Sequence, residues 1–343
     1  EGTHYKYHDE LEYASEAEKW LQMAATESDK LITSGRYEIY NTGHPQEDYF
    51  NMYRIDDKSD LKEAVLYVDY KTNILEHNMA AAGREAGCGF SKSFVESFLC
   101  SDGLPISLSN KYLGDETMRK ETANRDPRLK QLILTNDFPT NVTDDLKDST
   151  FVVNEDEFIT QHCFTGYRPI KGFNPIYSQA LYMKSSFDGI AYRYAETLLI
   201  NAEAKAELNT ITNADLDRTV NQLRDRVGMP HLTVNVGFTD PKWPDWGYSL
   251  SPILQEIRRE RCIELAGEGF RFNDLKRWKA GKVLNNVLTY VGKRKPDGNL
   301  AIVYPNYTNP DLSYQAGKSR TWEDKMYLYP IPTGELQRNP QLL

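Results

Sequence analysis

The sequence predicts a mainly helical fold, a tetratricopeptide-like scaffold that carries long loop-rich excursions and a few short β-strands. Three observations lead to this prediction. Small and apolar residues recur at helical spacing in the first and last thirds of the 343-residue chain. Two of the later helices are joined by a short turn, as in a tetratricopeptide unit. The residues between these regions are rich in turn formers.

The first predicted element is an amphipathic helix over residues 13–34, with Gly35 as its C-cap. Small residues dominate its apolar stripe, which consists of Ala14, Ala17, Leu21, Ala24, Ala25, Ser28 and Leu31. Another helix can approach such a stripe closely, so we expect this helix to belong to a stack.

Residues 37–187 have a different character. Short β-like segments, 64–70 and 151–153, lie among turn clusters at 43–45, 102–105, 136–148 and 166–175. Loops held by a rigid scaffold often carry binding surfaces. We therefore expect the ligand side of the molecule here.

Helical periodicity returns at residues 192–208, and Asn213 is the predicted cap of a second helix that ends at Val227. A third helix is predicted from Ser251, with Pro252 at its first position, to Gly267. A short piece over 273–279 and a weaker helical start after Gly281 follow. The chain is thus predicted to be a single unit, 1–343, with a scaffold helix (1–40), a loop-rich ligand side (41–187) and a C-terminal helical region with an irregular tail (188–343).

Composition excludes several classes of protein. The 41 basic and 50 acidic residues give a net charge of −9, which lacks the general electrostatic footprint of a nucleic-acid binder. No apolar run approaches the roughly 18 residues that a membrane span needs. The first ten residues lack the features of an export signal, so the chain is mature, truncated or cytoplasmic. Of four cysteines, only Cys88 and Cys100 are close enough in sequence to suggest a local disulfide.

Motifs of common catalytic and metal sites are absent from the sequence. There is no phosphate-binding loop, no GxSxG and no HExxH, and the cysteines have no zinc-ligand spacing. His4 and His8 have an i, i+4 spacing, but we expect them in a solvated N-terminal tail. We therefore predict no enzyme activity, no cofactor and no metal.

The densest set of charges lies in ERCIELAGEGFRFNDLKRW. Glu260, Glu264 and Glu268 fall on one helical face beside Arg261, and Arg271, Asp274 and Arg277 follow. Arginines can bridge such carboxylates, so we interpret the set as a charged network that locks a helix end to the next segment. A catalytic acid/base pair is the alternative.

Aromatic residues supply the candidate binding groups. Tyrosine is abundant, at 22 residues, and has a ring that stacks and a hydroxyl that hydrogen-bonds, as sugar binding requires. Trp243, Trp246 and Tyr248 lie in a proline- and glycine-rich segment, where they either pack back onto the helices or form a stacking platform. A second set, Tyr167, Tyr177 and Tyr182, leaves the same two alternatives. The candidates for ligand stacking are Trp243, Trp246, Tyr248, Tyr177 and Tyr182.

Several stretches together resemble the SusD/RagB family of bacterial outer-membrane nutrient-binding lipoproteins. They are LITSGRYEIY (31–40), SKSFVESFLCSDGLPI (91–106), NRDPRL (124–129), YRYAETLLINAEAKAEL (192–208), NQLRDRVGMP (221–230), RRERCIELAGEGFRFNDLKRW (258–278) and YLYPIPTGELQRNPQLL (327–343). The resemblance covers nearly the whole chain. By the matching motifs, Glu196, Glu203, Glu260, Glu264, Glu268, Arg271 and Asp274 are expected to hold helices together.

The resemblance implies a function without catalysis. Such a protein captures a glycan or another bulky nutrient at the outer face of the outer membrane and passes it to a SusC-like TonB-dependent transporter. Family members are longer and carry an export signal, a lipid-bearing cysteine and further helices, so we expect a C-terminal fragment whose only membrane contact is a lipid on the absent part. Two alternatives stay open: a pure interaction lid for the transporter, and a helical glycan-degrading enzyme.

Overall fold

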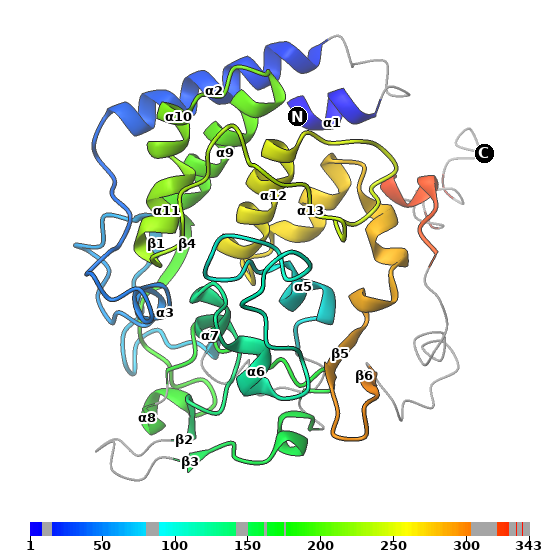
Figure 1. Cartoon of the computed structure of the whole chain (residues 1–343). Helices are drawn as coiled ribbons and strands as arrows, with labels where there is room; N and C mark the ends of the chain where they lie inside the picture. Colours follow the sequence, from blue (N-terminus) through cyan, green and yellow to red (C-terminus); the bar gives the residue numbers. More distant parts are fainter. Residues whose placement is uncertain are drawn as a thin grey trace.

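The computed structural model describes residues 1–8, 16–79, 89–141, 150–160, 163–174, 176–302 and 321–328, together with Gly334 and Arg338. The longer helices gather at one end of the molecule, and short helices, loops and small sheets fill the other (Figure 1). The predicted mainly helical class with few short strands is confirmed.

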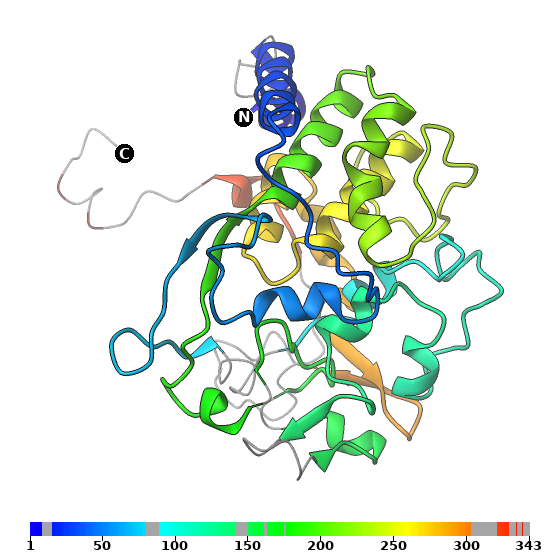
Figure 2. The same ribbon diagram turned by 90° about the vertical axis from the view of Figure 1, so that its left-hand side faces the viewer.

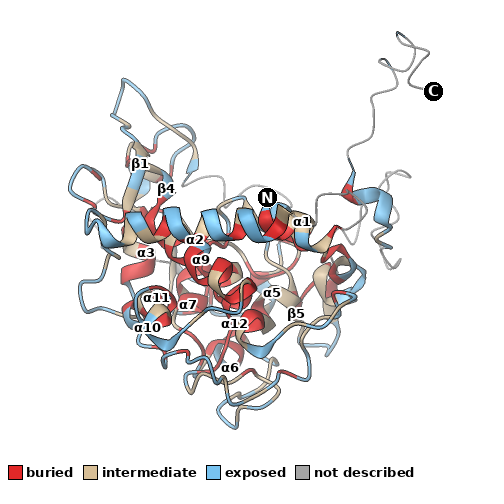
Figure 3. Ribbon diagram, turned by 90° about the horizontal axis from the view of Figure 1, so that it is seen from above, coloured by how far each residue is buried: buried red, intermediate tan, exposed pale blue. Residues whose placement is uncertain are grey.

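Three helices form the centre of the helical end. Helix α2 (Ala17–Thr33) packs on α9 (Tyr194–Glu207), which packs on α12 (Pro252–Glu264). Buried and exposed residues alternate along α2 (Figure 3). Its predicted stripe faces α9, where the Asn201 amide donates to the Ala25 carbonyl at 3.1 Å and to Ser28 Oγ at 2.9 Å. The predicted first helix is thus confirmed over 17–33, and residues 9–15 lie outside the described part.

Helix α1 (Gly2–Tyr7) packs against α2. A Cβ at Gly2 would lie 2.7 Å from Leu21 Cγ, so only glycine permits this approach. His8 is buried, and its Nε2 lies 2.9 Å from the Lys276 carbonyl. The expectation of a solvated N-terminal tail was therefore wrong.

The helix predicted over 213–227 consists of two helices, α10 (Asn213–Asp217) and α11 (Val220–Arg226). The Thr219 hydroxyl donates to the Asp215 carbonyl at 2.6 Å, a local bond that competes with helical pairing at the break. The N-cap is Thr212 rather than Asn213, because Thr212 and Asp215 form a capping box.

The third helix begins where it was predicted but ends at Glu264, three residues before the predicted end at Gly267. The Ser251 side chain accepts from the Leu254 amide, and Pro252 occupies the first turn of α12. Gly267 and Gly269, both at positive φ, turn the chain into α13 (Phe270–Arg277). The 3₁₀ helices η4 (Gly281–Asn285) and η5 (Val287–Thr289) follow.

The irregular end contains short helices and small antiparallel sheets. The helices are α3 (Asp48–Tyr53), α5 (Lys92–Ser97), α6 (Met118–Thr122), α7 (Arg128–Leu132), α8 (Tyr177–Ala180) and η3 (Glu155–Phe158). The last described helix, η7 (Asp324–Tyr327), lies instead beside the helical end, where the Tyr327 ring contacts His8. Strand β1 (Ala64–Val68) pairs with β4 (Gly189–Arg193), β2 (Pro139–Asn141) with β3 (Thr150–Phe151), and β5 (Val291–Arg294) with β6 (Leu300–Ile302). The strand predicted at 64–70 is confirmed over 64–68, whereas that at 151–153 ends at Phe151.

Two large hydrophobic clusters support the two ends. One contains Phe98, Leu129 and Tyr167 of the irregular end, and the other contains Leu198 and Leu223 of the helices, with all five side chains fully buried. Among the described helices, none is both long and apolar enough to cross a membrane. Cys100 is a free thiol, and Cys88, the other cysteine of the suggested disulfide, lies outside the described residues.

Candidate functional site

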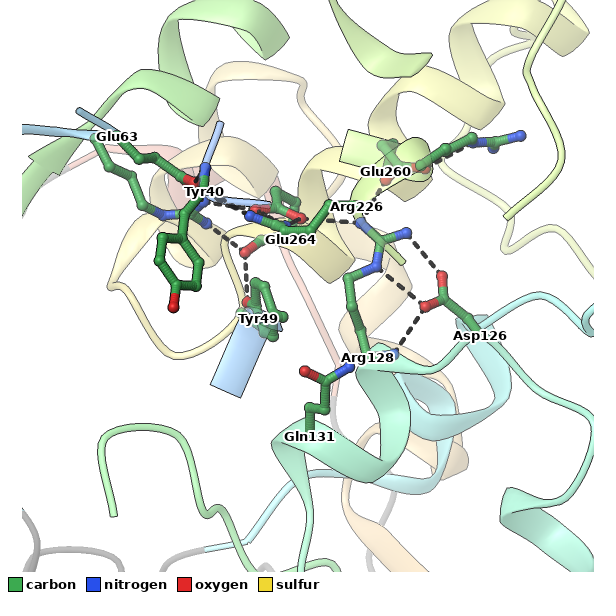
Figure 4. A network of polar contacts seen from close by, with 12 residues as sticks. Tyr40, Tyr49, Glu63, Asp126, Arg128, Gln131, Arg226, Glu260 and Glu264 are labelled. Carbon is green, nitrogen blue, oxygen red and sulfur yellow. Dashed lines mark hydrogen bonds and ion pairs between the residues drawn. The ribbon is translucent and has the colours of Figure 1, made fainter. Parts of the chain in front are cut away.

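A buried network of charges joins the end of α12 to the surrounding elements (Figure 4). Glu264 accepts hydrogen bonds from Arg226 Nη2 at 2.7 and 2.6 Å, from Arg128 Nη1 at 2.9 Å and from Arg193 Nη1 at 2.5 Å. Glu260 pairs with Arg128 Nη1 at 2.5 Å. These arginines come from α11, α7 and the end of β4, so the network ties both ends of the molecule to α12.

Glu268 and Glu203 are bound in the same way. Arg193 and Lys171 donate to Glu268 at 2.7 and 2.6 Å. Arg277 donates to both oxygens of Glu203 at 2.7 Å. Burial would raise the pKa of the Glu203 carboxyl, but the Arg277 guanidinium outweighs burial and lowers that pKa to about 2. These carboxylates hold the fold together and have no proton to exchange near neutral pH.

The other three motif residues differ from one another. Asp274 accepts from Arg261 Nε and Arg277 Nε, each at 2.9 Å. Glu196 is half-buried and makes no ion pair within the described part, and burial raises the pKa of its carboxyl. Arg271 is exposed on α13 and has no ionic partner among the described residues. The expectation that Arg271 holds helices together was therefore wrong, because its side chain faces solvent.

Trp246 is packed into the protein. Only 3% of its surface is exposed, and its ring stacks on Trp278 with centroids 5.4 Å apart and planes 19° apart. The Arg258 guanidinium lies 5.1 Å from the Trp246 ring. The structure therefore corrects the choice of Trp246 as a stacking residue, since its ring is buried against Trp278 and Arg258.

Tyr248 is also directed toward the helices. Its ring stacks on Tyr7 at 4.7 Å, and its hydroxyl donates to the Trp278 carbonyl. Burial raises the pKa of Tyr248 to about 12. Tyr248 thus anchors the 240–248 loop to α1 and α13, and its choice as a stacking residue is corrected as well.

Trp243 differs from its two neighbours because it borders a groove. Its half-buried ring lies 5.4 Å from Trp246 and 5.2 Å from the Arg259 guanidinium. The groove, of about 600 Å³, runs between α12, α13, the 240–246 loop, residues 89–97 and η5. Aromatic rings lie along it: Phe90, Phe94, Trp243, Phe270 and Phe272. Phe90 and Phe94 stack on each other at 4.4 Å.

Sequence reasoning missed most of this groove. Phe90 precedes Ser91, the N-cap of α5, and Phe94 lies in the first turn of that helix, so their spacing of four residues was a usable signal for a paired aromatic surface. Nothing in the sequence indicated that this pair lies opposite Phe270 and Phe272 of α13. The structure thus combines Trp243 with aromatic residues that the pattern search had not selected.

The second aromatic set lies elsewhere. Tyr167 is buried, and its hydroxyl donates to Glu121 at 2.8 Å. Tyr177 and Tyr182 are 57% and 74% exposed. They belong to residues 177–193, which pair with residues 64–79 through β1 and β4 and through the bridge between His77 and Ser185. The two strands lie side by side at the edge of the molecule (Figure 2). We call the segments 64–79 and 177–193 the apolar ribbon. Its other exposed large hydrophobic residues are Val65, Leu66, Val68, Ile74, Leu75, Met79, Leu181, Met183 and Tyr192.

Comparisons with known proteins agree with the resemblance. The model of the SusD family matches residues 29–343. SusD-like protein P2 of Formosa agariphila is 31% identical over 160 residues, which make up 47% of this chain and 26% of that protein. The chain therefore spans about a quarter of the length of this curated relative.

Two solved structures from Bacteroides fragilis show the same fold. A SusD-like protein superposes with a TM-score of 0.66 at 24% identity, covering 94% of this chain and 60% of the other. A SusD-like carbohydrate binding protein superposes with a TM-score of 0.63 at 24% identity, covering 95% and 62%. This chain thus corresponds to about three fifths of each solved chain.

Proposed function

The chain belongs to the SusD family, and from that premise we propose that it binds a glycan without catalysis, in the groove beside Trp243. The family is one of surface glycan-binding proteins. The observation that carries the proposal is the groove itself. Its volume of about 600 Å³ lies within the usual range of ligand sites, and its aromatic rings offer apolar faces between polar groups.

The carboxylates of the groove support binding rather than hydrolysis. Glycoside hydrolysis needs two available carboxyl groups on opposite sides of the scissile bond. Asp240 accepts from Arg259 Nη2 at 2.7 Å and from Ser107 Oγ at 3.0 Å, and Asp274 lies between two arginines. Glu96 is the third carboxyl group, and burial raises its pKa. A single available acid does not supply the pair that hydrolysis requires.

Delivery and location are part of the same proposal. We propose that the bound glycan passes to a SusC-like TonB-dependent transporter, which is the partner that the family implies. The protein would then lie at the outer face of the outer membrane, held there by a lipid on a part outside this chain. Capture by side chains in a groove, without chemistry, leaves the glycan intact for uptake.

A second function, as a protein-interaction lid, is favoured by the apolar ribbon. Tyr177, Tyr182, Ile74 and Leu66 expose large apolar surface, and contiguous exposed apolar surface typically marks a contact with another protein. Co-purification with the transporter, compared between the wild type and Tyr182→Lys, tests this function. Loss of the complex with glycan binding retained would assign the ribbon to the partner.

Affinity electrophoresis against a panel of polysaccharides tests glycan binding. Trp243→Ala removes the half-exposed ring of the groove, and Tyr182→Ala is the matched control on the apolar ribbon. We expect the first variant to lose most of the retardation that the wild type shows, since stacking on one aromatic ring contributes roughly 0.5–1.5 kcal/mol. Equal retardation of the wild type and Trp243→Ala would contradict the groove as the glycan-binding site. If only Tyr182→Ala lost retardation, the glycan-binding site would lie on the apolar ribbon instead.

A further inference from the structure

The residues that line the groove differ in charge from the chain as a whole. The protein carries a net charge of −9. The groove is lined by five cationic residues, Lys242, Arg258, Arg259, Arg261 and Arg271, and by three acidic ones, Glu96, Asp240 and Asp274. The ion pairs of Arg258 and Arg259 also include Glu207 and Glu256, which lie outside this lining. The positive charge open to a ligand is therefore that of the lining cations without an ion-pair partner.

Three of the five cations already have partners. Arg258 pairs with Glu207 at 2.5 Å, Arg259 with Asp240 at 2.7 Å and Arg261 with Asp274 at 2.9 Å. These arginines are buried, and their ion pairs belong to the framework of the groove. Their contribution to ligand charge recognition is therefore small.

The other two cations are available to a ligand. Lys242 and Arg271 are exposed, and neither side chain makes a hydrogen bond or an ion pair in the part of the chain that the structure describes; the Glu96 carboxyl lies within electrostatic reach of Lys242. Lys242 belongs to the loop that carries Trp243, and Arg271 lies between Phe270 and Phe272 on α13. Each of these two cations is thus next in the sequence to an aromatic residue that lines the same groove, so a sugar bearing an anionic group can meet both kinds of side chain there.

Building on the proposed function, we propose that the groove recognises an anionic glycan, with Lys242 and Arg271 binding its negative groups while the adjacent aromatic rings contact the sugar. The expected ligands are sugar polymers that carry carboxylate or sulfate groups. A neutral polymer offers no counter-charge to the exposed Lys242 and Arg271 side chains.

Matched pairs of polymers test this proposal by affinity electrophoresis of the whole chain. Polygalacturonate is compared with its carboxyl-reduced form, and dextran sulfate with dextran. We expect one charged member to retard the protein and its neutral counterpart to do so at least about tenfold less, the effect of one or two charge-assisted hydrogen bonds. The charged polymer that gives retardation distinguishes carboxylate from sulfate recognition, and retardation should decrease as added salt screens the charges.

Three charge variants separate a built site from unspecific attraction. Lys242→Gln and Arg271→Gln should each weaken retardation by the charged polymer about threefold to tenfold, the loss of one exposed charged contact. Lys19→Gln removes the same charge from the exposed face of α2 and should behave as the wild type.

The outcomes distinguish this proposal from the proposed function. Equal retardation by charged and neutral polymers that Trp243→Ala abolishes would overturn the anionic ligand and leave glycan binding in place. If all three charge variants weakened retardation by the charged polymer equally, the proposal of an anionic ligand in the groove would also be overturned. Absence of retardation by every polymer would overturn both proposals.

Discussion

Glu264 accepts two hydrogen bonds from Arg226, at 2.7 and 2.6 Å, and the exposed fraction of both side chains is 0%. Two further arginines, Arg128 and Arg193, donate to the same carboxylate. Because the four residues come from different elements, Glu264 is the point at which α12 is connected to the irregular end. The end of α12 supports one wall of the groove, so the geometry of the groove depends on this carboxylate.

Glu264→Gln should destabilise the protein strongly. The substitution keeps the shape of the side chain but removes the negative charge that three buried guanidinium groups share. Loss of one member of a buried ionic set typically costs about 3–5 kcal/mol, because the remaining charges stay buried without compensation. Unfolding in urea, followed by circular dichroism, measures the free energy of unfolding.

Glu38→Gln provides the matched control for that measurement. Glu38 pairs with Lys62 at 2.8 Å, but both side chains are about three fifths exposed. An exposed pair of this kind contributes roughly 0–1 kcal/mol, so the variant should unfold nearly as the wild type does. If both glutamine variants unfolded at the same urea concentration, the network around Glu264 would not be the main connection between the two ends.

The stability of the protein should fall in acid, in part because of Glu203. Its pKa is lowered from 4.5 to about 2 by Arg277 against the opposing effect of burial. A group with a depressed pKa contributes its stabilisation fully above the unfolded pKa and loses it as the pH falls through the folded pKa. The contribution of Glu203 should therefore disappear between about pH 4.5 and about pH 2, on the order of 3 kcal/mol.

Unfolding free energies measured across this pH range test the assignment. Glu203→Gln removes the titrating group, so its stability should decrease less steeply with acid than that of the wild type. Glu27→Gln, which changes an exposed glutamate on α2, should keep the wild-type slope. Glu268, Asp115 and Asp215 have pKa values lowered to about 2, so the slope should decrease without reaching zero.

Gly292→Ala should destabilise the β5–β6 sheet. A Cβ at Gly292 would lie 2.0 Å from the Thr165 carbonyl oxygen, so the backbone would have to move. Such overpacking typically costs about 1–3 kcal/mol. Gly189→Ala is the control, since its Cβ would meet only the Tyr70 ring at 3.2 Å and the ring can adjust. Thermal unfolding should show a lower midpoint for Gly292→Ala alone, and equal midpoints for the two variants would contradict this explanation.

The fold was predictable where the pattern in the sequence is local. The small-residue stripe of α2 and the Ser251–Pro252 start of α12 are read directly from neighbouring residues, and both predictions hold. The break between α10 and α11 was not predicted because it depends on the hydrogen bond from the Thr219 hydroxyl to the Asp215 carbonyl. Helical periodicity alone did not predict the overall architecture, which was identified from the family motifs.

The groove was less predictable because it is assembled from distant segments. Trp243 and Trp246 have nearly the same sequence surroundings, yet one borders the groove and the other is buried. The difference is set by Trp278 and Arg258, whose side chains both pack against the Trp246 ring. A pattern within the 239–252 segment contains no information about these contacts, so both tryptophans were chosen for the same reason.

Substitutions at Trp246 should separate its structural contribution from ligand binding. Trp246→Ala leaves a cavity against Trp278 and should cost about 3–5 kcal/mol, so any loss of glycan retardation would reflect unfolding. Trp246→Phe keeps an aromatic ring on Trp278 and removes an N–H that has no acceptor among the described residues. This variant should remain folded and bind glycan as the wild type does, whereas Trp243→Ala should remain folded and lose binding. Thermal unfolding and affinity electrophoresis on the same samples measure stability and glycan binding. A folded Trp246→Phe variant that no longer bound glycan would show that the ligand reaches beneath Trp243 to the buried Trp246 ring.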